Sequence, residues 1–503
     1  MVTAKIYSAA HIGFDGRLIE VECDASNGLP NIIIVGLANK AIDEAKERMR
    51  SSIKNSDLVM PRKRVTLNLA PADLPKDGSC YDLPMAVAVL AASQQIKPDV
   101  LKDSLFVGEL SLDGSLRPVR GIITHAEVAK QHNFTRIFVP KKSAQQASLV
   151  DGVEVIGIDS LSQLCKYLNN ALTIQPEVRK DLRPSRSPKS VDFGDIYGQD
   201  HAKRALEIAV AGHHNVLLTG PPGAGKTMMA RALLSILPPP SKNEIIAITK
   251  LHSLAGELKE QVHTNRPFRS PHHTASNVAL IGGGTNPRPG EISLANKGIL
   301  FLDELPEYSR SCLESLRQPL EDRVVTVARA QDTVTFPCDF MLVATQNPCP
   351  CGYYLDPDHE CTCTAHQINQ YSKKISGPLL DRIDLVVPVQ KVAHKHLLPE
   401  NGSTQESQSE VLFSRISEAR AKQAKRFQSV EKTNAHMSNR DITNLAYLTA
   451  DAKEFLESAA KKLSLSARSY MKVIRVARTI ADLGQEPTIE RKHISEALGY
   501  RPR

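Results

Sequence analysis

Residues 220–227 read Gly220-Pro221-Pro222-Gly223-Ala224-Gly225-Lys226-Thr227. An apolar run at 215–219 precedes them and a helical pattern at 228–237 follows, which is the strand-to-helix context that the phosphate-binding pattern G-x-x-x-x-G-K-[ST] requires. In such a loop the backbone N–H groups face the phosphates, and the N-terminus of the helix adds positive potential. We expect Lys226 to reach the β- and γ-phosphates and Thr227 to ligate Mg²⁺. The sequence therefore predicts a nucleoside triphosphate site.

The bulk composition is that of a globular protein. The chain has 503 residues, 41% of them hydrophobic, and this length predicts about three domains. No apolar run approaches the roughly 18 residues that a membrane helix needs, and the N-terminus lacks a signal-peptide core. We therefore expect a cytoplasmic protein with no membrane partner. The nine cysteines fit a reducing compartment and a metal better than a disulfide framework.

The positive charge is concentrated at the C-terminal end. Residues 411–503 contain 18 Lys and Arg against 10 Asp and Glu, so the whole excess of +8 lies there. A basic helical segment suits a polyanionic partner. A solvated helix surface explains the same charge equally well, so both interpretations stay open.

Residues 1–172 form a first unit, and we expect it to be an α+β domain. A basic, Pro-rich stretch at 173–192 follows, which is typical of a linker. The expected strands are 17–21, 31–35, 64–69, 104–108 and 136–139, and the expected helices are 40–55, 82–93 and 122–132.

The first unit resembles the proteolytic domain of Lon-type proteases. The resemblance rests on Pro75-Lys-Asp-Gly78, on residues 108–114 and on Pro118-Val-Arg-Gly121. That family uses a Ser–Lys dyad, but here Cys80 stands at the serine position, and residues 122–126, just after Gly121, contain no lysine. A nucleophile without a base is a poor catalyst, so we expect a non-proteolytic assembly or substrate-engaging domain. A Cys80–His125 pair is the minor alternative.

Two further apolar strands in the central unit, residues 193–392, end in polar groups. The run 298–302 leads to Asp303 and Glu304, and the run 340–344 leads to Asn347. We expect Asp303 to hold the Mg²⁺ shell and Glu304 to act as the general base for the attacking water. An amide such as Asn347 can orient that water.

These three elements in this order resemble the AAA+ ATPases, which implies an α/β P-loop NTPase core that binds ATP and Mg²⁺. The resemblance makes Asn347 the sensor 1 residue and Arg382, in Gly377-Pro-Leu-Leu-Asp-Arg382, the arginine finger that enters the neighbouring subunit's site. Such a guanidinium neutralises charge on the transferring phosphate. A finger of this kind implies a ring, expected to be a homohexamer.

The resemblance also implies that residues 411–503, after a polar loop at 393–410, form an α-helical lid. Its helices are expected at 411–427, 439–448, 451–463, 467–483 and 491–498. Arg468 matches the sensor 2 arginine, and Arg475 and Arg478 on the same helix are candidates to share its face.

Two insertions narrow the resemblance to the magnesium-chelatase-like branch. One insertion is 266–291. It includes His272 and His273, which we expect to be poor metal chelators. The other insertion is 323–336, whose pattern predicts a β-hairpin. With the Lon-like unit, the whole chain resembles the ComM/YifB family. The resemblance implies a ring helicase that acts on single-stranded or branched DNA and drives branch migration of recombination intermediates, including integration of transforming DNA. Arg329 near the hairpin tip is a candidate phosphate contact, or simply a solvated arginine.

Four cysteines in two close pairs suggest a zinc site. Cys349 and Cys351 are separated by nine residues from Cys361 and Cys363. Four thiolates can complete a tetrahedral structural zinc site, and four reduced thiols in a loop are the alternative.

Two other functions remain open from the sequence. One is a protein-remodelling motor of the magnesium-chelatase type, and the other is an ATP-dependent protease of the Lon type. The missing lysine after Gly121 argues against the protease.

Overall fold

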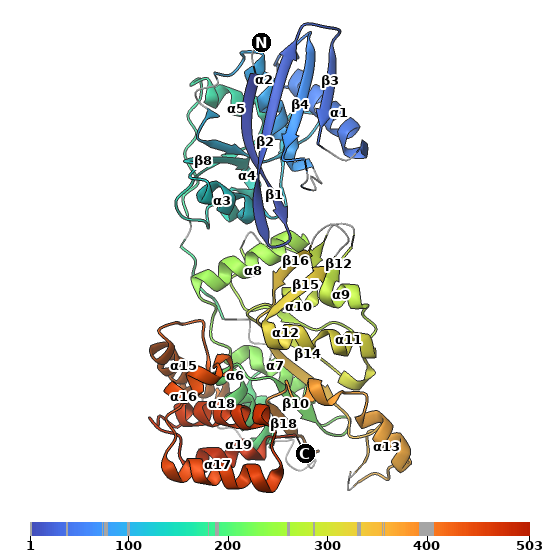
Figure 1. The fold of residues 1–503 in the computed structure, drawn as a ribbon, viewed down its shortest axis with the longest axis vertical. Coiled ribbons are helices and arrows are strands. Elements are labelled where there is room, and N and C mark those ends of the chain that lie inside the picture. The colour runs from blue at the N-terminus through green and yellow to red at the C-terminus, as the bar shows by residue number, and fades with distance from the viewer. Residues whose placement is uncertain are drawn as a thin grey trace.

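The computed structural model is an elongated molecule with a domain at each end of a central α/β unit (Figure 1). The structure describes residues 3–36, 39–72, 74, 79–97, 101–179, 181–186, 191–258, 262–284, 287–328, 333–354, 356, 358–391 and 407–502.

The N-terminal domain is built on a seven-stranded mixed sheet in the order β3-β4-β2-β1-β5-β8-β9. All five expected strands are present. β1 and β9 were not expected, and β2 is longer than predicted because it pairs antiparallel with β1 along its length. The strands are β1 Thr3–Ile12, β2 Asp15–Ser26, β3 Asn31–Val35, β4 Arg64–Ala70, β5 Ser104–Phe106, β8 Arg136–Pro140 and β9 Glu154–Ile158, with a small ribbon of β6 Glu109–Leu110 and β7 Leu116–Arg117.

Among the described residues, five α-helices complete this domain. Helix α2 is buried along its entire length, which explains its uniformly apolar sequence. The helices are α1 Asn39–Asn55, α2 Asp82–Ala92, α3 Ile122–Gln131, α4 Lys141–Ala147 and α5 Leu161–Leu168. The α+β class expected for this unit is confirmed.

The central unit contains a five-stranded parallel sheet in the order β11-β14-β17-β10-β18. Its inner strands are almost wholly buried, as expected of a sheet covered by helices on both faces. The strands are β10 Val216–Thr219, β11 Phe268–Arg269, β14 Ile299–Leu302, β17 Met341–Gln346 and β18 Leu385–Pro388, and the helices around them are α6 Asp200–Gly212, α7 Lys226–Ile236, α11 Arg310–Ser315, α12 Arg317–Asp322, α13 Ala365–Ser372 and α14 Gly377–Leu380.

Both insertions lie on the side of the central unit that faces the N-terminal domain (Figure 1). The expected β-hairpin is confirmed as β15 Val324–Ala328 paired with β16 Thr333–Pro337. Arg329, which we expected near the hairpin tip, lies outside the described residues. The first insertion and the helix before it comprise α8 Lys242–Ala255, α9 Asn277–Ile281, β12 Gly282–Gly283, β13 Arg288–Pro289 and α10 Glu291–Leu294.

The N-terminal domain packs directly onto these elements. Ile12 and Phe14, at the turn between β1 and β2, contact an apolar cluster formed by Leu251 of α8 and by Val334 and Phe336 of β16. Polar contacts reinforce the interface: Lys250 of α8 pairs with Glu127 of α3 and lies 3.9 Å from the Phe14 ring centre, and the Gly121 N–H donates to Ser253 Oγ at 3.0 Å. The domain therefore contacts both the hairpin and α8.

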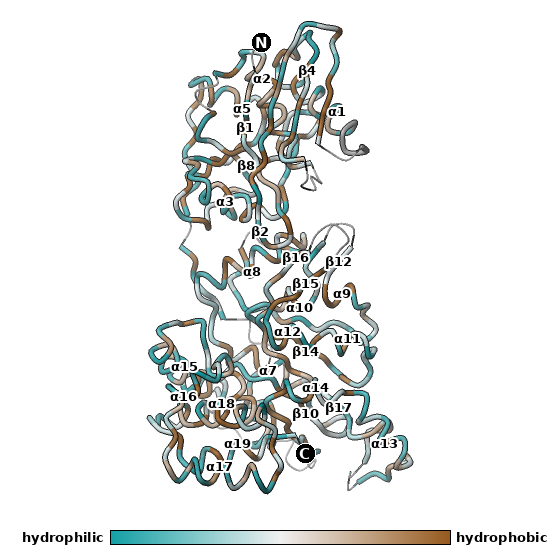
Figure 2. Tube along the Cα trace, viewed as in Figure 1, coloured by the Kyte–Doolittle hydropathy of each residue, from teal (hydrophilic) through white to brown (hydrophobic). Residues whose placement is uncertain are grey.

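The C-terminal domain is helical, as expected. Its helices are α15 Gln408–Phe427, α16 Asn439–Leu445, α17 Ala450–Leu463, α18 Ala467–Leu483 and α19 Arg491–Gly499. Hydrophilic and hydrophobic residues alternate along them (Figure 2), and their apolar faces share one core with α6, α7 and the five-stranded sheet of the central unit. None of the helices in the described part of the chain is long and apolar enough to cross a membrane.

Candidate nucleotide site

The phosphate loop joins β10 to α7 in a conformation that depends on glycine. Gly223 and Gly225 have φ of +76° and +83°, in the left-handed region that favours glycine. A Cβ at Gly220 would lie 2.1 Å from the Val389 carbonyl oxygen, so only glycine allows the loop to pass this close to the chain leaving β18. No side chain caps the N-terminus of α7, which begins at Lys226. The helix N-terminus is therefore free to meet an anion.

The Lys226 side chain lies inside the loop. It is buried, and its Nζ donates to the carbonyl oxygens of Gly220 at 2.6 Å and Pro221 at 2.9 Å and to Asn347 Oδ1 at 3.0 Å. Burial lowers the pKa of this amine, while the charges of Asp303 and Glu304 oppose that shift. The contact with Asn347 links two predicted site residues that are 121 positions apart.

Asp303 and Thr227 meet beside the loop. Thr227 Oγ1 donates to Asp303 Oδ2 at 3.1 Å, and Thr345 Oγ1 donates to Asp303 Oδ1 at 2.5 Å. These hard oxygen donors are the type that Mg²⁺ prefers. The convergence follows from the topology, because β14, β17 and β10 are parallel neighbours and their carboxyl ends share one edge of the sheet.

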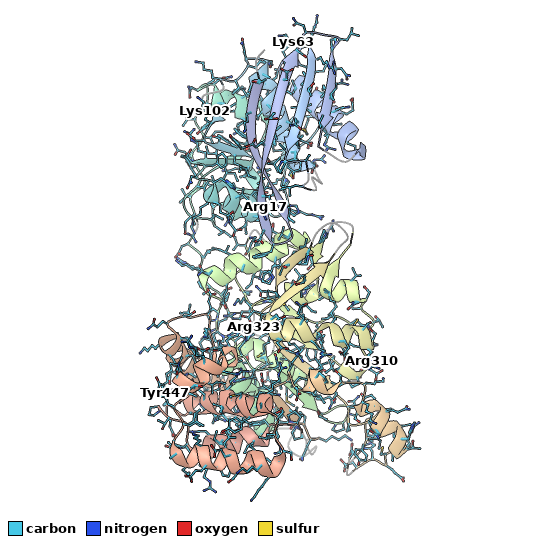
Figure 3. The ribbon with its side chains drawn as sticks, in the orientation of Figure 1. Arg17, Lys63, Lys102, Arg310, Arg323 and Tyr447 are labelled. Atoms are coloured by element: carbon cyan, nitrogen blue, oxygen red, sulfur yellow. The ribbon has the colours of Figure 1, made fainter. Side chains whose placement is uncertain are left out.

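Glu304 is exposed beside this cluster. Its backbone N–H donates to Thr345 Oγ1 at 2.9 Å, and its φ of +51° is an unusual value for a residue other than glycine. Glu304 and Asn347 line a cavity of about 990 Å³ together with Arg310, which is labelled in Figure 3. The carboxylate therefore has access to solvent next to the phosphate loop.

Arg382 and Arg468 lie near the other end of the parallel strands, where the strands begin. Asn215, which immediately precedes β10, donates from Nδ2 to the Arg382 carbonyl oxygen at 2.9 Å, whereas Lys226 follows the other end of β10. Four strand residues at about 3.3 Å each span about 13 Å. Arg382 is therefore remote from the phosphate loop of its own chain.

Both arginines share one acidic partner. The Arg382 and Arg468 guanidinium groups each pair with Glu321 of α12, the latter at 3.4 Å, and all three residues line a cavity of about 560 Å³. Arg475 lines the same cavity. The structure thus brings the predicted finger and sensor 2 residues together, although they are 86 positions apart in the sequence.

We expected Arg478 as a candidate to lie on the same face of α18 as Arg468, and this expectation is wrong. Arg478 is fully buried, donates to the carbonyl oxygens of Pro487 at 2.9 Å and Glu486 at 2.7 Å, and pairs with Asp482 at 3.1 Å. At about 100° per residue, a position ten residues along a helix is turned about 80° from the first, whereas one seven residues along is turned only about 20°. Arg478 therefore stabilises the C-terminal domain and does not belong to the site.

The four clustered cysteines converge. Cys349 Sγ lies 3.3 Å from Cys351 Sγ and 3.7 Å from Cys361 Sγ, and Cys351 Sγ lies 3.6 Å from Cys361 Sγ. Together with Cys363, all four sulfur atoms lie within 4.8 Å of one another. Tetrahedral zinc with Zn–S bonds of about 2.3 Å separates its sulfurs by about 3.8 Å, so the cluster matches such a site in size.

Family models for the magnesium chelatase subunit ChlI match three parts of the chain: residues 21–143, residues 192–397 and, for the C-terminal part of that subunit, residues 406–501. The competence protein ComM of Haemophilus influenzae is 42% identical over 505 residues, covering 100% of this chain and 98% of ComM. YifB of Salmonella typhimurium is 40% identical over 502 residues, covering 100% and 97%. The chain belongs to the ComM/YifB family of magnesium-chelatase-like AAA+ proteins. It is therefore an ATPase.

The chain also shares local similarity with a protease. Lon protease 2 of Bacillus subtilis is 25% identical over 193 residues, which are 34% of this chain and 35% of that protein. Burial raises the pKa of the Cys80 thiol to about 12 and lowers the pKa of the His125 imidazole to about 4. At neutral pH both groups are uncharged, which is the reverse of an activated thiolate–imidazolium pair. These two side chains do not form a nucleophile and base.

A second cluster of titratable side chains joins the central unit to the C-terminal domain. It was not predicted from the sequence. His436 Nδ1 accepts from the Thr433 N–H at 3.0 Å, so the proton on Nε2 is donated to Asp339 Oδ1, also at 3.0 Å. Lys297 pairs with the same carboxylate at 2.8 Å, and Arg323, labelled in Figure 3, lies 3.5 Å from it. Because His436 has no free lone pair and cations surround Asp339, this cluster is a structural tie and not a metal site.

The adjacent histidines of the first insertion form a local pair. His272 Nδ1 lies 2.8 Å from Thr274 Oγ1, and the His272 and His273 ring centres are 4.1 Å apart. Neither belongs to a group able to hold a metal among the residues that the structure describes.

Proposed function

We propose that this protein is a cytoplasmic ATP-driven ring motor that acts on DNA, a homohexameric helicase that drives branch migration of recombination intermediates. The proposal of a ring is supported by the positions of Lys226 and Arg382, which lie at opposite ends of β10. An arginine that cannot reach its own phosphate loop is available to a neighbouring subunit's loop, as rings of AAA+ proteins require.

At the nucleotide site each residue has a distinct role in ATP hydrolysis. Lys226 exchanges the oxygen atoms of Gly220, Pro221 and Asn347 for phosphate oxygens, so its partners change while its position inside the loop is kept. Glu304 accepts the proton of the attacking water, which Asn347 orients. Thr227 and Asp303 would hold Mg²⁺, whose charge offsets that of the phosphates.

Arg382 and Arg468 act on the next subunit's ATP. Both guanidinium groups are held on Glu321, so one carboxylate presents two positive charges at the same edge of the protomer. Bound triphosphate on the neighbour would compete with Glu321 for these charges, because a more highly charged anion attracts the guanidinium groups more strongly. Engagement of the pair would thus depend on whether the neighbouring site holds ATP.

DNA as the cargo is supported by two observations. The similar protein from Haemophilus influenzae is named a competence protein, and the C-terminal segment has an excess of basic residues. Arg329, which follows β15 in the sequence, is our candidate phosphate contact. Electrostatic binding of this kind releases counterions, so it weakens steeply with salt.

A protein-remodelling motor is the second candidate. The family models carry the name of the magnesium chelatase subunit over all three matched parts, including residues 21–143, so the N-terminal domain does not by itself separate the two functions. An ATPase that responds to a protein client and not to DNA would identify this function. The protease alternative has less support, because Cys80 and His125 are both neutral.

We also propose zinc as the occupant of the cysteine cluster. Its four thiols, the sulfur separations near 3.7 Å and the local C-x-C pairs fit a closed tetrahedral site. Four protein ligands leave no open position, so the zinc would be structural.

The deciding experiment is ATP turnover by the purified protein alone and with single-stranded, duplex and branched DNA. Lys226→Ala and Glu304→Gln should abolish turnover, and Lys242→Ala and Glu454→Gln, on exposed residues away from the site cavity, are the matched controls. Stimulation by DNA that both site variants lose supports the DNA motor. Turnover that no form of DNA changes contradicts it.

A further inference from the structure

We propose that the cysteine loop, residues 349–363, is a metal-dependent clasp that holds the phosphate loop in its binding conformation, so that loss of the metal weakens ATP binding. This inference rests on the zinc site proposed above and extends it from a structural element to a determinant of nucleotide affinity.

The clasp touches the phosphate loop through Gly352. A Cβ at this position would lie 2.7 Å from both Cγ and Cδ of Pro222, so the backbone of the cysteine loop packs directly against the phosphate loop. Gly352 has a φ of +87°, and its N–H donates to the Cys349 carbonyl oxygen at 3.0 Å. The contact with Pro222 is therefore made by a tight turn that begins at a zinc ligand.

Both ends of the clasp lead to residues near Asn347. Cys349 follows Asn347 by two residues, and α13 begins two residues after Cys363. The buried Tyr371 of α13 lines the same cavity as Asn347. Since Asn347 also accepts from Lys226, a displacement of the cysteine loop would in addition move the amide that we expect to orient the attacking water.

A third contact ties the clasp to the strand beside the phosphate loop. Lys391, just beyond β18, pairs at 2.6 Å with Asp356, whose side chain is only 2% exposed. The chain between β18 and Lys391 includes Val389, the residue whose carbonyl oxygen lies against Gly220. The clasp is thus fixed to the loop directly through Pro222 and indirectly through the chain that leaves β18.

A bound metal would join the two cysteine pairs and so fix the conformation of the cysteine loop. Among the contacts described, the two cysteine pairs meet only through their sulfur atoms and the Cys351 N–H, which donates to Cys363 Sγ at 3.4 Å. Thiolates repel one another without a cation, whereas zinc joins both pairs and removes the entropy of an open loop. Without it, Gly352 and Asn347 would lose their fixed positions.

The test combines zinc content with nucleotide affinity in the full-length protein. Zinc is counted by mass spectrometry, and binding of a fluorescent ATP analogue is titrated in excess Mg²⁺ before and after a zinc-selective chelator. We expect one zinc per chain, and binding about tenfold or more weaker once zinc is removed, restored by added zinc. Residues that orient a site from outside typically have effects of this size.

Three variants separate the outcomes. Cys361→Ser combined with Cys363→Ser should lose zinc and weaken binding, whereas Cys165→Ala in the N-terminal domain should do neither. Lys391→Ala keeps all four cysteines and the backbone of the cysteine loop, so it should retain zinc and still weaken binding by releasing Asp356; it decides the matter if the double variant fails to fold. Absence of zinc from the unmodified protein overturns the metal site and the clasp, but not the DNA motor. Zinc that can be removed without changing affinity, with normal binding by Lys391→Ala, overturns the clasp alone.

Discussion

Lys226 Nζ donates to Asn347 Oδ1 at 3.0 Å, which joins the ends of two neighbouring parallel strands at one point. Asn347 therefore stands next to the amine that would hold the phosphates and beside the exposed carboxylate of Glu304. We expect a residue in this position to affect the chemical step more than the binding of nucleotide.

Replacement of Asn347 by alanine should lower kcat about 100-fold and leave the affinity for ATP within a few-fold, because the amide orients the water and does not anchor the nucleotide. Turnover and fluorescent-nucleotide binding measure the two effects. Asn369→Ala, on the exposed face of α13, is the control. A large loss of affinity with unchanged kcat would show that Asn347 is a binding residue instead.

The buried contact between the domains predicts a stability effect. Lys250 is buried against Glu127 and the Phe14 ring, so Glu127→Gln removes the charge that compensates the amine. We expect the free energy of unfolding to fall by about 1–3 kcal/mol. The exposed pair of Arg136 and Glu154 supplies the control, since Glu154→Gln should cost less than about 0.5 kcal/mol. Equal effects in denaturant titrations would contradict the assignment.

His125 predicts acid sensitivity. Burial lowers its pKa from 6.5 to about 4 in the folded protein, so below pH 6.5 the unfolded chain binds a proton that the folded chain does not. Stability that is present at pH 7 is therefore lost as the pH falls from 6.5 towards 4, by about 2 kcal/mol at pH 5. His125→Gln should reduce the difference between unfolding at pH 7 and pH 5, whereas His132→Gln at the exposed end of α3 should not. An unchanged difference in His125→Gln would contradict this account.

Arg329 predicts a change in salt dependence. If it contacts a DNA phosphate, Arg329→Ala should weaken binding to all sequences alike and reduce the slope of log affinity against log salt concentration by about 1. Binding measured by fluorescence anisotropy at several salt concentrations gives the slope. Lys63→Ala, at the far end of the N-terminal domain (Figure 3), should leave the slope unchanged. An equal change in both variants would mean that Arg329 makes no specific contact.

Motifs that lie within a few consecutive residues could be predicted from the sequence, because a strand end and its polar successor are adjacent in the chain. The phosphate loop, Asp303, Asn347 and the five C-terminal helices are of this kind. The convergence of the four cysteines follows the same logic, since only nine residues separate the pairs.

Features made by residues far apart in the chain were not predicted. The tie between Asp339 and His436 and the pair of Lys250 with Glu127 join residues 97 and 123 positions apart, and no local pattern marks either. Strand β1 was missed because its pairing with β2, not its own sequence, defines it. The common partner of Arg382 and Arg468 likewise depends on how the C-terminal domain docks on the motor.

The most direct test of the account mixes two inactive proteins. Arg382→Ala retains its phosphate loop but lacks the finger, and Lys226→Ala retains the finger but lacks the loop, so each alone should lose ATP turnover by about 1,000-fold. In rings formed by random mixing at equal amounts, about a quarter of the interfaces combine an intact loop with an intact finger. The account predicts that ATP turnover returns on mixing, to a fraction of that order. Turnover that stays at the level of the separate variants, in mixtures shown to form common rings, would contradict an arginine supplied by the neighbouring subunit.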